Sequence, residues 1–92
     1  MRDDRFEWDD RKAASNLRKH GVSFEMARLA FSDLDAIEDL DETDDEERIA
    51  RIGLAGDRLL LVIFTMRDPR IRIISVRKAK RDEELRYFSQ FQ

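Results

Sequence analysis

The sequence predicts an α+β fold, in which an antiparallel β-sheet is packed by two N-terminal helices and a C-terminal helix. Three observations indicate this class. Start and stop signals for two short helices occupy the first third of the chain, strand-like apolar runs follow from residue 48 to residue 77, and apolar residues at helical spacing come last. The expected element order is β-α-α-β-β-β-α. We expect a single domain over residues 1–92, because a chain of this length is sufficient for one modest core.

A short strand and a well-delimited helix begin the chain. Residues 5–8 form the strand, and the acidic pair that follows ends it. Asp9 or Asp10 then caps a helix over residues 11–20, because a short carboxylate accepts hydrogen bonds from the free N–H groups of a first turn. Gly21 ends this helix, since glycine adopts the positive φ of a helix terminus at little cost.

The second helix and an optional strand come next. Ser23 is a suitable N-cap for a helix over residues 24–31, whose apolar side chains at i, i+3 and i+7 form one stripe that faces a core. An extra short strand over residues 36–40 is also compatible with the sequence.

Three strands and two turns make up the second half. Residues 48–54 form a moderate strand and residues 55–57 a turn. Residues 58–65 are apolar on both faces, which predicts a central strand covered on both sides. Residues 67–69 form a second turn, after which residues 71–77 pair back as the next antiparallel strand.

A C-terminal helix over residues 79–91 closes the domain. Its Leu85, Phe88 and Phe91 recur at helical spacing, and we expect them to face the core. Of the neighbours Tyr87 and Phe88, one must then face outward. An outward Tyr87 near the basic strand would donate a proton or stack on a base, or else be a surface residue without a role.

Composition limits the possible classes of protein. The chain has net charge −3 with 42% charged and 41% hydrophobic residues, and it contains no cysteine. Disulfides and thiolate metal sites are therefore excluded. The longest apolar run, Leu59 to Phe64, is too short to span a bilayer, and no apolar leader follows the N-terminus. These features predict a cytoplasmic protein without membrane association.

The most informative segment runs from residue 67 to residue 81, where seven Lys or Arg residues occur with a single acid, Asp68. Charges of this kind on an edge strand discourage aggregation. Seven in fifteen positions favour a second interpretation, the binding of a polyanion through guanidinium and ammonium groups. The candidate RNA-binding residues of this segment, apart from the catalytic candidates named below, are Arg70, Arg72, Lys78, Lys80 and Arg81.

An acidic segment contrasts with this basic one. Residues 33–47 contain ten Asp or Glu and no Lys or Arg. Such a run is usually a solvated loop and edge strand. The alternative is a docking site or shield for a basic partner.

The only histidine, His20, lies beside Lys19 at the end of the first predicted helix. It is either a cation that stabilises the helix C-terminus or a catalytic group. RNA cleavage without a metal needs a base for the 2′-hydroxyl, an acid for the leaving 5′-oxygen and cations for the phosphorane. His20 is suited to be base or acid, while Arg67, Arg72 or Arg77 would hold the phosphoryl oxygens.

Other chemistry has less support. Trp8 is either core filling or a stacking platform for a base. The acidic runs at residues 9–10 and 44–47 lack the spacing of metal ligands, so no metal site is expected. The chain has none of the glycine-rich motifs of nucleotide cofactors, so no cofactor is expected either.

Several motifs together give the chain a resemblance to the BrnT family. They occur in order over nearly the whole chain: Phe6-Glu7-Trp8-Asp9, Lys12, Asn16-Leu17-Arg18-Lys19-His20-Gly21-Val22, Phe24, Glu46-Glu47-Arg48, Ile52-Gly53 and Arg72-Ile73-Ile74-Ser75-Val76-Arg77-Lys78-Ala79. The resemblance implies a RelE-like ribonuclease toxin of a bacterial toxin–antitoxin pair, which inhibits translation by cutting RNA. It also implies a BrnA-like antitoxin that neutralises the toxin and binds operator DNA to repress the shared operon.

Carried over by position, Lys19, His20 and Arg77 match the family's motifs, and Arg67 falls in the variable turn before the arginine-rich strand. The resemblance implies a role for them in cleavage or phosphate binding, without saying which group is acid and which is base. The chain departs from the family at Met66, where an acidic residue is frequent.

Three hypotheses follow. The first is a metal-independent endoribonuclease toxin, and the second is a non-catalytic module that docks a DNA-binding antitoxin. The third, a DNA-binding domain in its own right, has no recognisable reading helix to support it.

Overall fold

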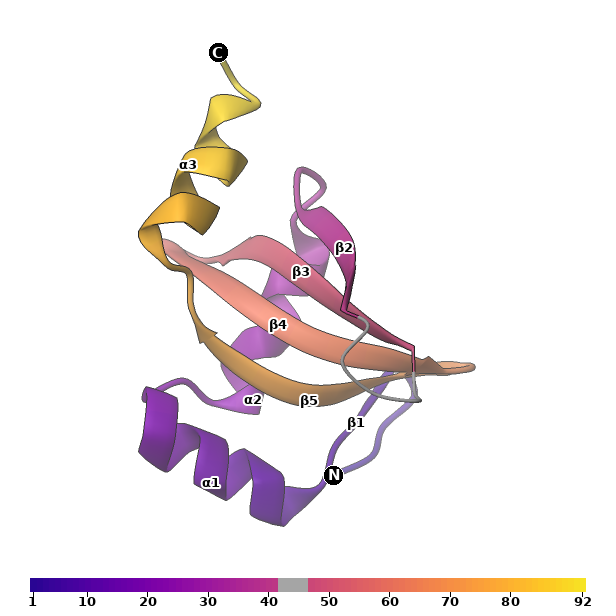
Figure 1. Ribbon diagram of the computed structural model, residues 1–92. Coiled ribbons are helices and arrows are strands. Elements are labelled where there is room, and N and C mark those ends of the chain that lie inside the picture. Colours follow the sequence, from indigo (N-terminus) through magenta and orange to yellow (C-terminus); the bar gives the residue numbers. More distant parts are fainter. Residues whose placement is uncertain (42–46) are drawn as a thin grey trace.

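The computed structural model describes residues 1–41 and 47–92, and it confirms the predicted α+β class. Within these residues five strands form one sheet in the order β1-β5-β4-β3-β2 (Figure 1). Along the chain the elements are β1 (Phe6–Glu7), α1 (Asp10–His20), α2 (Phe24–Leu29), the 3-10 helix η1 (Ala30–Ser32), β2 (Ile37–Asp41), β3 (Arg48–Ala55), β4 (Arg58–Arg67), β5 (Arg70–Lys78) and α3 (Arg81–Ser89).

The expectation of a wholly antiparallel sheet is wrong at one edge. Strands β2 to β5 are antiparallel to their neighbours, but β1 runs parallel to β5, with Phe6 opposite Ile71 and Glu7 opposite Arg72. The sheet is therefore mixed. Hairpin turns fix the direction of successive strands, whereas β1 reaches β5 through the two helices and the rest of the sheet, so no local turn signal sets its direction.

The helix termini follow the sequence signals. The Asp9 carboxylate accepts hydrogen bonds from the N–H groups of Arg11 and Lys12, and Gly21 has φ of 69° with its N–H donating to the Leu17 carbonyl. Ser23 Oγ accepts from the N–H of Met26 at 3.0 Å. Each cap satisfies backbone groups that a helix end leaves without partners.

Helix α2 covers one face of the sheet, while α1 lies along the β5 edge (Figure 1). The buried residues of the main core are Phe6, Trp8, Val22, Phe24, Ala27, Ala30, Ala55, Leu60, Val62, Ile73 and Val76. Burying a large apolar side chain stabilises a fold by about 1.5–3 kcal/mol, so this face supplies most of the hydrophobic stabilisation.

The opposite face of the sheet is covered only in part. A smaller cluster of Ile52, Leu59 and Tyr87 forms where α3 packs, while Leu61 and Ile63 stay half-buried. The prediction that β4 is the central strand is confirmed. Its second face is, however, sheltered only towards α3.

The apolar face predicted for the last helix is wrong. Leu85, Phe88 and Phe91 are 60%, 47% and 55% exposed, and the buried residue of α3 is Tyr87, at 1%. The Tyr87 hydroxyl donates a hydrogen bond to Asp33 Oδ2 at 2.6 Å, so its polar end is satisfied inside. Helical spacing identifies a stripe of residues but not which stripe packs. Here α3 projects from the end of β5 (Figure 1), and its Tyr87 packs with Ile52 and Leu59 of the sheet.

No helix in the described part of the chain combines the length and apolar character needed to cross a membrane.

Candidate functional site

A buried side chain attaches α1 to the edge of β5. Asn16 Nδ2 donates to the carbonyls of Val76 at 2.8 Å and Val22 at 3.0 Å, and Asn16 Oδ1 accepts from the N–H of Val76 at 3.1 Å. Strand β1 pairs only with Ile71 and Arg72, so the second half of β5 has no neighbouring strand on this side. The Asn16 amide takes the place of a neighbouring strand there, because it offers the donor and the acceptor of a peptide group.

A register irregularity in β5 lies beside this attachment. Ile63 pairs with Ser75 and Phe64 with Ile73, which leaves Ile74 without a partner on β4. Irregularities of this kind re-aim side chains next to functional sites. Both Ile74 and Ser75 border a hollow of about 210 Å³ between α1 and β5.

We call this the basic hollow. It is lined by Lys12, Ser15, Asn16, Lys19, His20, Ile74 and Ser75. Two ammonium groups, one imidazole and two hydroxyls thus surround a space whose described lining contains no carboxylate. Such groups donate hydrogen bonds and positive charge to phosphate. The predicted residues Lys19 and His20 are brought together here, and both are exposed.

Sequence reasoning did not assign roles to Lys12, Ser15 or Ser75 at this site. Lys12 lies two helical turns before Lys19 and Ser15 one turn before it, at spacings of seven and four residues, which places them on one side of α1. That spacing was the available signal for these two residues. Ser75 could not be found in this way, because its position depends on the irregular register of β5.

A second, larger hollow of about 550 Å³ lies across the open face of the sheet, and we call it the sheet groove. Its lining is Asp39, Leu40, Asp41, Ala50, Ile52, Leu61, Ile63, Arg77, Asp82, Glu83 and Arg86. Ser75 and Arg77 pair with Ile63 and Leu61, on the same face of β5. The basic hollow and the sheet groove therefore adjoin across β5, at residues separated by about 7 Å along the strand.

Three arginines of the basic segment have partners within the chain. Arg77 forms a bidentate pair with Glu83, at 2.8 and 2.9 Å, and Arg72 NH1 contacts Glu7 Oε2 at 2.7 Å. Arg70 Nε donates to the Asp3 carbonyl at 2.7 Å. Asp68 is the only acid within the segment, but the fold brings carboxylates from β1 and α3 to it.

The Arg77–Glu83 pair is also fixed to the helix start. Glu83 Oε1 accepts a hydrogen bond from the N–H of Lys80 at 2.7 Å, in addition to that from Arg77. The hydrogen bonds from Arg77 lower the pKa of Glu83, and the same contact raises the pKa of Arg77. Both groups are thus charged at neutral pH and hold each other in place.

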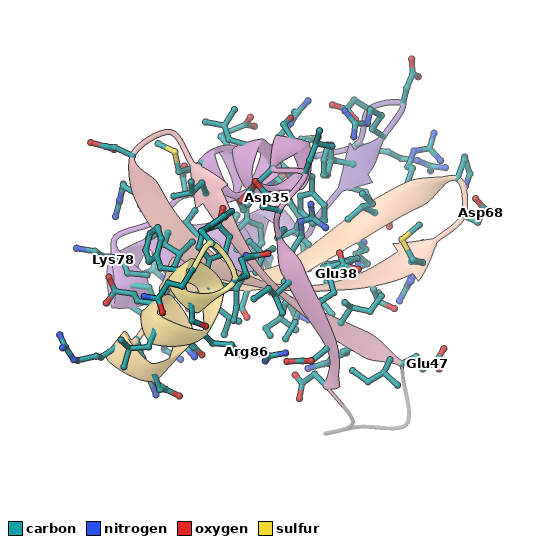
Figure 2. The ribbon with its side chains drawn as sticks, turned by 90° about the horizontal axis from the view of Figure 1, so that it is seen from above. Asp35, Glu38, Glu47, Asp68, Lys78 and Arg86 are labelled. Carbon is teal, nitrogen blue, oxygen red and sulfur yellow. The ribbon has the colours of Figure 1, made fainter. Side chains whose placement is uncertain are left out.

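Arg67 lies far from the other catalytic candidates. It is opposite Arg70 at the tip of the β4–β5 hairpin, while Arg77 is seven residues further along β5. At about 3.3 Å per residue the separation along the strand is roughly 23 Å. Figure 2 shows the same relation, with Asp68 at the tip of the hairpin and Lys78 at its opposite end. The structure therefore does not bring Arg67 together with His20.

The remaining basic candidates lie beyond Arg77. Lys78, Lys80 and Arg81 are exposed at the end of β5 and the beginning of α3. They form a cationic extension of the surface rather than part of either hollow's centre.

The aromatic candidates for base stacking are buried. Trp8 is 6% exposed and packs edge-to-face on Phe24 with centroids 5.7 Å apart. Burial, with hydrogen bonding to Asp33, raises the pKa of Tyr87 to about 12. Neither ring is offered to a base, which corrects the expectation of an outward Tyr87 and leaves Trp8 as core filling.

The acidic segment is partly used inside the fold. Asp33 accepts hydrogen bonds from the N–H of Leu54 at 2.8 Å and from Tyr87. Burial acts to raise the pKa of Asp33, but these hydrogen bonds outweigh it and the pKa lies below its ordinary value. Glu38 pairs with Arg51, and Asp39 pairs with Arg86 on the side of α3 towards β2 (Figure 2).

The other acidic runs give no metal site in the described chain. Asp9 is the N-cap of α1, and Asp10 contacts the N-terminal ammonium group. Residues 44–46, and with them Glu46 of the family motif, lie outside the described residues. Over 1–41 and 47–92, no three His, Asp or Glu side chains are arranged to hold a metal ion.

The fold and the basic hollow define a small α+β domain with a cation-lined surface at one edge of its sheet, suited to a polyanion. Comparison with known families makes this specific. The profile described as "Ribonuclease toxin, BrnT, of type II toxin-antitoxin system" matches residues 8–83, and the chain belongs to this family. The match extends from just after β1 to the first turn of α3, so it includes the basic hollow and Arg77. No curated protein is similar enough to the chain to count as a match.

Proposed function

We propose that this toxin is a metal-independent endoribonuclease that cleaves RNA at the basic hollow and thereby inhibits translation in the cytoplasm. The observation that carries the proposal is the convergence of Lys12, Lys19, His20 and Ser75 in one hollow without a carboxylate in its described lining. Membership of a ribonuclease toxin family supplies the reaction class.

The cleavage chemistry requires a proton acceptor, a proton donor and positive charge. The ribose 2′-oxygen attacks phosphorus as its proton passes to a base, and the bond from phosphorus to the 5′-oxygen breaks as that oxygen gains a proton. The products are a 2′,3′-cyclic phosphate and a 5′-hydroxyl. His20 serves as one of the two proton-transfer groups, and Lys19 and Lys12 stabilise the phosphorane.

Arg77 contributes from the boundary between the two hollows. The Arg77 guanidinium donates two hydrogen bonds to the Glu83 carboxylate, in the same bidentate geometry that it would use with a phosphate. RNA bound in the basic hollow would reach Arg77 by exchanging a phosphate for the Glu83 carboxylate. The flanking cations, Arg70, Arg72, Lys78, Lys80 and Arg81, would then attract the rest of the strand, and Arg67 would act only on RNA that extends to the hairpin tip.

The family description supplies a second partner, an antitoxin. We infer a BrnA-like protein that binds operator DNA and represses the operon together with the toxin. A second candidate function, a docking module without catalysis, is favoured by one observation: Arg70, Arg72 and Arg77 already have partners within the chain.

Induced expression without antitoxin tests the proposal. We expect the wild type to arrest growth and degrade cellular RNA, and His20→Ala and Lys19→Ala to abolish both effects. Arg18→Ala is the matched control, because Arg18 is an exposed cation on α1 outside the lining of the hollow. Normal growth with intact RNA in all strains, despite folded protein, would favour the docking module instead.

A further inference from the structure

The sheet groove has a composition that RNA binding does not explain. Its floor consists of the apolar side chains of Ala50, Ile52, Leu61 and Ile63, from β3 and β4. Leu61 and Ile63 are only half-buried, although they lie on the central strand of the sheet. A central strand with a half-covered apolar face indicates a surface that another polypeptide covers.

The rim of the groove is acidic. Four carboxylates line it against two guanidinium groups, and each guanidinium is already paired, Arg77 with Glu83 and Arg86 with Asp39. Asp41 and Asp82 remain, and neither forms an ion pair with a described residue. The sheet groove therefore carries net negative charge, which repels a phosphate backbone and attracts Lys or Arg.

We propose that the sheet groove is the docking site of the antitoxin, and that it takes a segment in which aliphatic side chains are flanked by Lys or Arg. The proposal rests on the proposed function, since it requires this chain to be the toxin of a pair. Charge complementarity selects a cationic protein segment over RNA, and the apolar floor selects aliphatic side chains between the cations.

The position of the groove gives the docked segment a direct effect. Arg77 lines the groove while Ser75, on the same face of β5, lines the basic hollow. A segment lying over Arg77 would prevent RNA bound in the basic hollow from reaching this guanidinium group. Neutralisation then needs no change in the conformation of the toxin.

The test is a binding comparison on the full-length chain. Affinity for the purified antitoxin encoded in the same operon is measured by calorimetry for the wild type, for Asp41→Lys/Asp82→Lys and for the milder Asp41→Asn/Asp82→Asn. The matched control is Asp57→Lys/Asp68→Lys, because it makes the same change in net charge at two exposed turn residues away from the groove. Binding of a 2′-O-methyl oligouridine, which cannot be cleaved, is measured on the same proteins.

We expect the groove reversal to weaken antitoxin binding about tenfold or more, the neutral pair to weaken it less, and the control by under about threefold. Binding of the oligonucleotide should not weaken in the groove variants. Three results would each overturn the proposal. They are an equal loss of antitoxin affinity in the groove and control variants, a loss of oligonucleotide binding in the groove variants, and no antitoxin binding by the wild type. Thermal melting shows whether Asp41→Lys/Asp82→Lys is folded. If it is misfolded, the antitoxin affinity of Asp41→Asn/Asp82→Asn tests the proposal instead. RNA cleavage is read separately, so an inactive wild type that still binds through the groove would contradict the ribonuclease and not the docking site.

Discussion

Replacing Asn16 by Asp tests how the basic hollow is held together. The substitution keeps the shape of the side chain but removes both hydrogen bonds that Nδ2 donates, to the carbonyls of Val22 and Val76. It also places a carboxylate oxygen against these two buried carbonyls. Since α1 is attached to the edge of β5 through this amide, the perturbation acts on the wall of the hollow itself.

The magnitude follows from the number of groups left without partners. Each buried acceptor that loses its donor costs about 1–3 kcal/mol, so two carbonyls cost roughly 2–6 kcal/mol. For a domain of this size, about 3 kcal/mol corresponds to a fall in Tm of roughly 12–24 °C. A loss of about 3 kcal/mol is a large part of a typical total free energy of unfolding of about 5–15 kcal/mol.

Urea unfolding monitored by circular dichroism measures the effect. We expect Asn16→Asp to regain part of the lost stability as the pH is lowered, because burial raises the pKa of the new carboxyl and its protonated form donates one hydrogen bond. The comparison is Arg18→Asp, which introduces the same side chain at an exposed position of the same helix. A free energy of unfolding for Asn16→Asp within about 0.5 kcal/mol of the wild type would refute the attachment described above.

Three further predictions concern other contacts. Tyr87 is the only tyrosine, so absorbance titration should show one phenol ionising near pH 12. The contribution of Tyr87 to the free energy of unfolding should be complete below the ordinary pKa near 10 and be lost as the pH rises towards 12. Ionisation near pH 10 would contradict the burial of this side chain. Glu83→Gln should release Arg77 and tighten the binding of 2′-O-methyl oligouridine. In the wild type, the stability that Glu83 contributes is lost as the pH falls through its lowered folded-state pKa, and the variant should lack this pH dependence. An unchanged affinity for the oligonucleotide would contradict the competition between Glu83 and phosphate. Gly53→Ala should lower the free energy of unfolding by about 1–3 kcal/mol, because its Cβ would lie 2.9 Å from the Ala30 carbonyl oxygen, and unchanged urea unfolding would contradict this close packing.

Local signals in the sequence predicted the local structure well. Asp9, Gly21 and Ser23 act through residues within four positions along the chain, so their effect is visible in the sequence. The optional strand at residues 36–40 is present as β2, at Ile37–Asp41. Lys19 and His20, which line the basic hollow, were candidates because a helix C-terminus with a titratable group is a local pattern.

Contacts between distant segments were not predictable in this way. Within the sequence the basic segment contains one acid, Asp68, but Glu7 and Glu83 reach its arginines from other elements. Asn16 was visible only as part of a motif, although a buried asparagine within a helix requires hydrogen-bond partners, here on β5. The inward direction of Tyr87 depends on Asp33, 54 residues earlier in the chain.

The central claim, metal-independent cleavage at the basic hollow, is tested most directly by the ends of the RNA products. The purified chain is incubated with a synthetic single-stranded RNA in EDTA, together with His20→Ala and the control Arg18→Ala. We predict fragments with 2′,3′-cyclic phosphate and 5′-hydroxyl ends from the wild type and from Arg18→Ala, and none from His20→Ala. Cleavage that requires a divalent ion, leaves 5′-phosphate ends or persists in His20→Ala would contradict the account.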